Sequence, residues 1–152
     1  MSVLGVNVVG EVAYCVILDG DEIVEAEPFK LEVPPGVAFS DGLVALSGHV
    51  EFLVSDRDVS RISVVAAENS YSDTYAALAP RIGIETAILI AGARAGIAVE
   101  RMPRPEVRSR LGLPKSGKLS DLCGQVTQAS GKYWRNKRDI AALGAIAGRS
   151  AS

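Results

Sequence analysis

The chain has 152 residues, of which 48% are hydrophobic and 22% are charged, and we expect residues 1–152 to form one globular domain. Its start lacks a basic segment followed by an apolar stretch, and Glu85 and Arg94 interrupt its longest apolar region, so we expect neither a signal peptide nor a membrane partner. The net charge of -2 is divided into -10 over residues 1–100 and +8 over residues 101–152, which favours a polyanionic partner, DNA or RNA, for the basic part.

The first third of the chain predicts three antiparallel strands. Two apolar segments rich in β-branched residues, Val3–Val9 and Val12–Leu18, flank Gly10-Glu11 and predict a β-hairpin. After the turn signal at 19–21, a third strand is expected from about Glu22 to Val33, with an interruption near Pro28.

The middle of the chain alternates helix and strand. Leu43, Leu46, Val50 and Leu53 have helical spacing and predict a helix over about 42–54, capped by Ser40-Asp41. The apolar run 61–67 predicts a fourth strand that is covered on both faces. A polar loop at Tyr71-Ser72-Asp73, a short segment stopped by Pro80, and a helix over about 84–95 should follow.

The last third predicts one short strand and then helices. The strand is expected at 97–101, the helices at 106–111, 119–129 and 139–147, and a loop or frayed helical start at 131–138. The resulting order, β-β-β-α-β-α-β-α-α-α, predicts an α/β fold. Its mixed five-stranded sheet would combine a three-stranded antiparallel meander with parallel strands and carry helices on both faces.

Cysteine and histidine content limits the chemistry. Cys15 and Cys123 lie in apolar segments, so we expect buried, reduced thiols in a cytoplasmic protein. A single histidine, His49, argues against a histidine-rich metal site and against a histidine-based catalytic triad.

Three polar residues lie in otherwise apolar surroundings. Asn7 is in the first strand, Glu68 ends the fourth, and Asp139 opens the last helix. If these elements are neighbours, the three side chains could converge at one edge of the sheet, where carboxylates would suit Mg²⁺ or Mn²⁺. The alternatives are a solvated strand end for Glu68 and a helix N-cap for Asp139.

These residues lie in short motifs that resemble the ribonuclease H-like superfamily and, within it, the RuvC-type Holliday-junction resolvases. The motifs are Leu4-Gly5-Val6-Asn7-x-x-Gly10, Ala66-Ala67-Glu68, 91–97, 105–108, 118–120 and 139–147. The resemblance spans nearly the whole chain and rests on the order and spacing of the motifs. It implies a ribonuclease H-like domain, a metal-dependent nuclease ancestry and a homodimer.

The resemblance also implies a site. That family places an Asp in the first strand, a Glu at the end of the fourth and one or two Asp at the last helix. Glu68 and Asp139 match and would hold the metal, whereas Asn7 replaces the first Asp and Ala142 stands where some members carry a second acid. Since asparagine offers one neutral oxygen, metal affinity should fall.

A basic segment directly precedes Asp139 and is a candidate nucleic-acid surface. Its cations could neutralise phosphates, and its aromatic rings could stack on bases. The alternative is a solvated loop that Trp134 anchors to the core. The candidate nucleic-acid-binding residues are Lys115, Lys118, Lys132, Tyr133, Trp134, Arg135, Lys137 and Arg138.

Two functions remain open on the sequence. One is a nucleic-acid-binding protein with weak or altered Mg²⁺- or Mn²⁺-dependent nuclease activity, in which Asn7, Glu68 and Asp139 are the catalytic residues. The other is a non-catalytic relative that kept the fold as a binding or assembly module. A sugar-kinase or actin-like ATPase is excluded because it would need two such domains and phosphate-binding loops.

Overall fold

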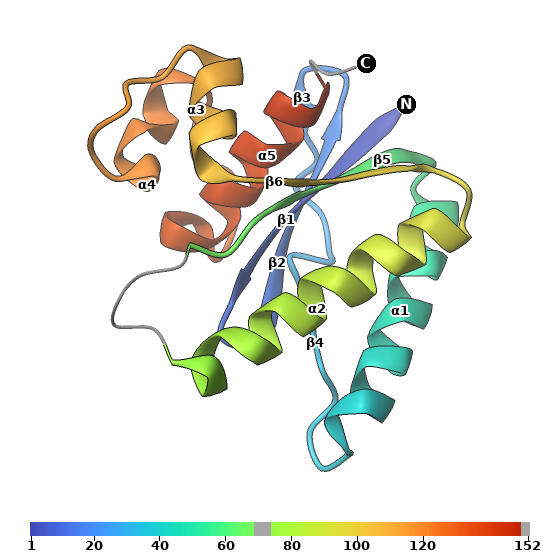
Figure 1. Ribbon diagram of the computed structural model, residues 1–152. Coiled ribbons are helices and arrows are strands. Elements are labelled where there is room, and N and C mark those ends of the chain that lie inside the picture. Colours follow the sequence, from blue (N-terminus) through green and yellow to red (C-terminus); the bar gives the residue numbers. More distant parts are fainter. Residues whose placement is uncertain (69–73, 150–152) are drawn as a thin grey trace.

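The computed structural model describes residues 1–68 and 74–149 and contains one six-stranded sheet (Figure 1). Its strand order is β3-β2-β1-β5-β6, and β4 also pairs with β2. β1 is antiparallel to β2 and parallel to β5, and β5 is parallel to β6, so the sheet is mixed as expected. The strands are β1 (Ser2–Val9), β2 (Val12–Asp19), β3 (Glu22–Ile23), β4 (Lys30–Glu32), β5 (Val59–Val65) and β6 (Ala98–Met102).

Helices cover both faces of the sheet (Figure 1). On one face α1 (Phe39–Asp56) and α2 (Tyr75–Arg94) bury the main core against the even-numbered residues of β1. On the other face α5 (Asp139–Arg149) lies over β1 and β5, flanked by α3 (Arg104–Leu111) and α4 (Leu119–Leu122). The α/β architecture predicted from the sequence is therefore confirmed.

The expected third strand is two short strands. β3 pairs with the end of β2, and β4 pairs with its beginning. Between them, the six residues 24–29 lie opposite only three residues of β2, 15–17. The extra residues interrupt the ladder, and Pro28 among them has no N–H to donate. Two backbone bonds still hold this segment to β2, from Val24 N–H to the carbonyl of Ile17 at 2.8 Å and from Cys15 N–H to the carbonyl of Phe29 at 2.9 Å.

Three helix boundaries differ from the prediction. Pro80 does not stop a helix but lies inside α2, close to its exposed first turn, where water can bind the carbonyl that Pro80 leaves without a partner. α1 begins at Phe39, so Ser40-Asp41 lies within its first turn and makes no cap. The helix expected at 119–129 ends after α4 and a 3₁₀ turn, Cys123–Gln125. The expected loop Tyr71-Ser72-Asp73 lies outside the described residues.

α2 is long and apolar enough to span a membrane, and a third of its most apolar 18-residue stretch is buried inside the protein. The buried side chains of Ile84, Ala87, Ile88 and Ala91 face the sheet. Both cysteines are free and buried, as expected, and burial raises the pKa of each thiol to about 12.

Small residues let α5 lie directly on the sheet. A Cβ at Gly5 would come within 2.0 Å of the Ala141 carbonyl oxygen and 2.8 Å of the Ala145 side chain. A Cβ at Gly144 would likewise come within 2.6 Å of the Val65 side chain. Only glycine at these positions permits such a close approach, and the approach sets the height of α5 above β1.

We expect Gly5→Ala to lower the free energy of unfolding by about 3 kcal/mol, because the new methyl group must displace the backbone of α5. Gly48→Ala is the matched control, since a Cβ at this helical position meets nothing within 4 Å among the described residues and should stabilise by about 0.5–1 kcal/mol. Denaturant unfolding followed by circular dichroism measures both. Equal stability of the two variants would contradict the close packing of α5.

Candidate functional site

A row of paired residues crosses the sheet near the carboxyl ends of β1, β5 and β6. Asn7 pairs with Tyr14 on one side and with Val65 on the other, and Val65 pairs with Met102. Tyr14 in turn pairs with Lys30 of β4. Residues that pair across neighbouring strands share a face of the sheet, and α5 covers the face that holds Val65 and Met102. The row therefore forms the floor of the region where the sequence predicts a site.

Asp139 lies at the start of α5, is 1% exposed, and has both carboxylate oxygens fully engaged. Oδ1 accepts hydrogen bonds from the backbone N–H of Lys137 at 3.1 Å and of Ile140 at 2.7 Å. Oδ2 accepts from the backbone N–H of Asn136 at 3.1 Å and from the Ser120 hydroxyl. Since a carboxylate offers about four lone-pair positions, these four donors occupy them all.

Asn7 is also 1% exposed and acts as a donor. Its Nδ2 donates to the backbone carbonyl of Lys137 at 3.1 Å. Asn7 and Asp139 therefore hold the same residue, Lys137. Asn7 binds the backbone carbonyl of Lys137, and Asp139 binds its backbone N–H. An aspartate at position 7 has no proton to donate at neutral pH and would face this carbonyl with a negative charge.

Glu68 follows β5 by three residues, and its side chain is 66% exposed. Its Oε1 lies 3.7 Å from Nε of Arg104, which is 18% exposed. Burial lowers the pKa of Arg104, whereas the negative charges of Glu68 and Asp139 raise it, and the positive charge of Arg81 lowers it. Arg104 therefore lies within electrostatic reach of both predicted acids.

Glu85 lies on α2, on the face of the sheet opposite α5. From there it holds residue Ala67, which directly precedes Glu68. The Glu85 carboxylate is 1% exposed, accepts a hydrogen bond from Ala67 N–H at 2.9 Å and forms an ion pair with Arg101 Nε at 3.0 Å. Burial raises the pKa of Glu85, and the Ala67 bond and Arg101 oppose the shift. The lone acid in an apolar helical run was the available signal in the sequence, but only the fold shows its partner.

The residues present do not fit a site for two divalent cations. No group of three or more His, Cys, Asp or Glu side chains able to hold a metal occurs in residues 1–68 and 74–149. Asp139 has no lone pair left for a cation, and Ala142 is buried against Val16. Glu68 faces a guanidinium instead. Divalent hard cations need several oxygen ligands close together, which this arrangement does not offer.

The predicted basic segment divides into exposed and buried residues. Lys115, Lys118, Lys132 and Arg135 are exposed, Tyr133 is 41% exposed, and Trp134 and Lys137 are half-buried. Trp134 packs against the core, as the alternative interpretation of this loop required.

Arg138 is a correction to the predicted nucleic-acid surface. It is 1% exposed, and its guanidinium donates to the backbone carbonyls of Cys15 at 2.8 Å, Lys132 at 3.2 Å and Ser130. It also lies 4.6 Å from the Phe29 ring. Because these contacts bury its charge, Arg138 holds the 130–138 loop against β2 and has no access to a phosphate.

An aromatic and cationic cluster, formed by Tyr14, Lys30, Tyr133 and Lys137, lies beside Asn7. The Tyr14 and Tyr133 ring centroids are 5.9 Å apart, Lys30 Nζ lies 5.0 Å from the Tyr133 ring, and Lys137 Nζ lies 5.4 Å from the Tyr14 ring. Lys30 and Tyr14 could not be predicted as part of this cluster, because only the pairing of β2 with β4 brings them beside Tyr133.

No protein-family model and no curated protein matches the sequence. Solved structures do resemble the fold. Thermus thermophilus RuvC has a TM-score of 0.73 at 12% identity, with 99% of this chain and 94% of that chain covered. A T. thermophilus RuvC in complex with a Holliday junction substrate has a TM-score of 0.69 at 12% identity, with 99% and 93% covered. The chain therefore has a RuvC-type, ribonuclease H-like fold.

We expect Asn7→Asp to destabilise the protein by about 1–3 kcal/mol, because the Lys137 carbonyl oxygen loses its hydrogen-bond donor and a buried carboxylate then faces it. Asn136→Asp makes the same chemical change at an exposed position of the same segment and should alter stability by less than about 0.5 kcal/mol. Urea unfolding at neutral pH compares them. An Asn7→Asp variant as stable as Asn136→Asp would show that the amide is not needed as a donor.

Proposed function

We propose that this protein binds nucleic acid through the face formed by the carboxyl ends of β1, β5 and β6 and the adjoining basic loops, and that it does not hydrolyse the bound strand. The observation that carries the non-catalytic part is the saturation of Asp139 by four hydrogen bonds. To bind a metal, Asp139 would have to give up bonds that fix the start of α5 and the 136–138 segment. Each such buried bond costs about 1–3 kcal/mol to lose.

The binding part is supported by exposed cations that surround the site on several elements. Lys115 and Lys118 flank a turn before α4, and Lys132 and Arg135 lie on the loop before α5. Tyr133 offers a partly exposed ring beside Lys30. Cations supply sequence-independent affinity for phosphates, and aromatic rings stack on unpaired bases. Because a structure with this fold holds a Holliday junction, branched DNA is the first ligand to test, with single-stranded DNA and RNA beside it.

A weak Mg²⁺- or Mn²⁺-dependent nuclease is the competing proposal. It would use Glu68 and Asp139 as ligands and Asn7 as a neutral third. In this arrangement Asn7 points its amide nitrogen at a carbonyl and Glu68 is paired with Arg104. We therefore favour the binding or assembly module, acting in the cytoplasm and without a membrane partner.

We expect Arg135→Ala to weaken binding to a branched DNA by about threefold to tenfold. The slope of log affinity against log salt concentration should fall by about one, because one fewer counterion is released. Arg149→Ala is the control, because this partly exposed arginine also pairs with an aspartate, Asp21 at 2.5 Å, but lies at the other end of α5 from the basic loop and outside the α1–α2 groove. Fluorescence anisotropy over a salt series measures both. Equal loss of affinity in the two variants would refute the assigned surface.

The same DNA incubated with the protein and millimolar Mn²⁺ should stay intact. Cleavage that disappears in both Glu68→Ala and Asp139→Ala would establish the competing nuclease. Cleavage that survives both changes would indicate a contaminant, and the binding proposal would then stand on the anisotropy data alone.

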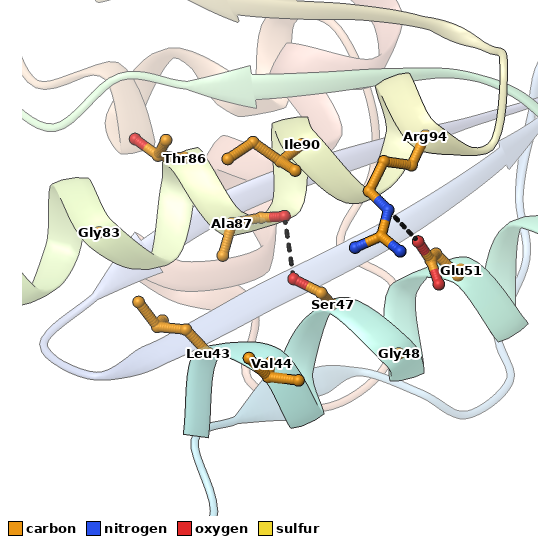
Figure 2. Close-up of a pocket in the computed structure, with 10 residues that line it drawn as sticks. All are labelled: Leu43, Val44, Ser47, Gly48, Glu51, Gly83, Thr86, Ala87, Ile90 and Arg94. Atoms are coloured by element: carbon orange, nitrogen blue, oxygen red, sulfur yellow. Dashed lines mark hydrogen bonds and ion pairs between the residues drawn. The ribbon is translucent and has the colours of Figure 1, made fainter. Parts of the chain in front are cut away.

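We also propose that the protein is a homodimer and that the α1–α2 face forms its interface. A groove of about 620 Å³ runs between these helices, bridged by Ser47 with the Ala87 carbonyl and by Arg94 with Glu51 (Figure 2). Large apolar side chains are exposed on or beside both helices, namely Val37, Phe39, Val44, Phe52, Tyr75, Ile82 and Ile90. Val44 of α1 and Ile90 of α2 line the groove and are exposed, which favours a self-complementary contact with a second copy.

We expect Ile90→Glu to convert the dimer to a monomer, because the buried charge would have no partner in the interface. Ile90 is 51% exposed in the single chain, so the monomer should keep its stability. Analytical ultracentrifugation gives the mass, and Ile82→Glu tests the same face. A wild-type protein that is monomeric at all concentrations would refute the dimer.

A further inference from the structure

We infer that Arg104 takes the place of a divalent cation in this site, where its guanidinium neutralises Glu68 and binds a phosphate oxygen of the nucleic-acid backbone without any metal. This inference rests on the proposed function and names the residue that receives the phosphate. It follows from the position of Arg104, from its unsatisfied donor and from the charges of the pocket around it.

The position of Arg104 is set by the pairing of β5 with β6. Ala66 N–H donates to the Met102 carbonyl at 2.9 Å just beyond the last register pair, Val65 with Met102. Two residues further along each segment, after the strands have ended, come Glu68 and Arg104, whose side chains lie 3.7 Å apart. The guanidinium thus lies beyond the carboxyl ends of the parallel strands, close enough to both Glu68 and Asp139 for their charges to raise its pKa.

A second arginine approaches the same place from the other side. Arg81 of α2 donates from Nε to the carbonyl of Val8 at 3.2 Å, at the end of β1. Its charge is close enough to lower the pKa of Arg104. Two fixed positive charges here repel Mg²⁺ or Mn²⁺ but attract a phosphodiester, so the electrostatics of the site favour an anion.

Arg104 has an unused donor. Its side chain is 18% exposed, and its buried Nε has no hydrogen-bond partner within the described part of the chain, because Glu68 Oε1 at 3.7 Å is too far. A buried guanidinium nitrogen without an acceptor among the described protein atoms retains its desolvation cost, so an anionic oxygen placed near it would be favourable. A phosphate offers several oxygens to the planar fork of a guanidinium, and Glu68, being two-thirds exposed, can move to let one enter.

The pocket beside Arg104 carries a positive net charge. Its volume is about 530 Å³, and among the described residues its charged lining consists of Arg104, Arg108 and Lys115 against the carboxylate of Glu68. Arg108 is engaged elsewhere, since it donates to the carbonyls of Pro114 at 2.8 Å, Ser116 at 3.2 Å and Gly117 at 2.5 Å. These bonds hold the loop that presents Lys115. Of the described residues that line this pocket, Arg104 and Lys115 are therefore the cations available to a phosphate.

Glu68→Gln gives the sharpest test, because the two kinds of site predict opposite signs. If Arg104 binds the phosphate, loss of the competing carboxylate should raise DNA affinity about twofold to fivefold. If Glu68 holds a metal that bridges to the DNA, the same change should lower affinity, and only when Mg²⁺ is present. Glu68 is exposed, so the variant should fold, and anisotropy with Mg²⁺ and with a chelator separates the two outcomes.

Arg104→Met removes the charge but keeps most of the apolar stem. We expect about a tenfold loss of DNA affinity, the loss expected for one charge-assisted hydrogen bond. Arg110→Met is the control, because this arginine lies on the same helix but is held by Glu100 at 2.5 Å and Glu106 at 2.6 Å, and its loss should change affinity less than twofold.

The outcomes separate the inference from the function it rests on. A wild-type protein that binds no DNA refutes the proposed function and the inference with it. A wild-type protein that binds DNA only with Mg²⁺, or an Arg104→Met variant that binds as well as Arg110→Met, refutes the inference and leaves the function standing. Thermal unfolding of each variant shows whether a loss of affinity reflects a loss of folded protein.

Discussion

The arrangement of the site depends on the direct contact between α5 and β1. Gly5 brings the Ala141 carbonyl so close that no side chain fits between them, and Gly144 repeats this contact at β5. Because α5 is held at this distance, Asp139 at its first residue and Asn7 in β1 reach the same backbone segment. The basic loop before α5 is thereby fixed over the carboxyl ends of the strands. Packing of small residues thus determines where the charged residues lie.

The three polar residues predicted from the sequence are engaged by hydrogen bonds and an ion pair. Asp139 serves as an acceptor for two backbone N–H groups before the helix, one within it, and a serine hydroxyl. Asn7 donates to the Lys137 carbonyl, and Arg104 lies 3.7 Å from Glu68. The bonds of Asn7 and Asp139 hold the 136–138 segment beside the carboxyl ends of the strands.

The sequence predicted much of this fold and part of the site. Periodicity located the strands β1, β2, β5 and β6 and the helices α1, α3 and α5 to within a few residues, because apolar patterns record which face of an element is buried. Pro80 was wrongly predicted to end a helix. The free-energy cost of a proline inside a helix depends on whether water can bind the carbonyl that loses its partner, and only the folded structure shows whether that carbonyl is exposed. Arg138 was misread as a phosphate ligand, because a basic run does not show which of its members turns inward. Arg104, Arg81 and Glu85 were missed, since their partners lie on other elements.

The sequence by itself determined the α/β class, the general order of elements and the basic C-terminal third. It also placed Asn7 in the first strand, Glu68 after the fourth and Asp139 at the start of the last helix. These are local or compositional properties, so one chain read residue by residue contains them. Only the tertiary structure decided what the three residues do. Hydrogen-bond saturation of Asp139, donation by Asn7 and the pairing of Glu68 with Arg104 depend on atoms from distant segments, whose distances are set by the packing of α5 and by the register of the sheet.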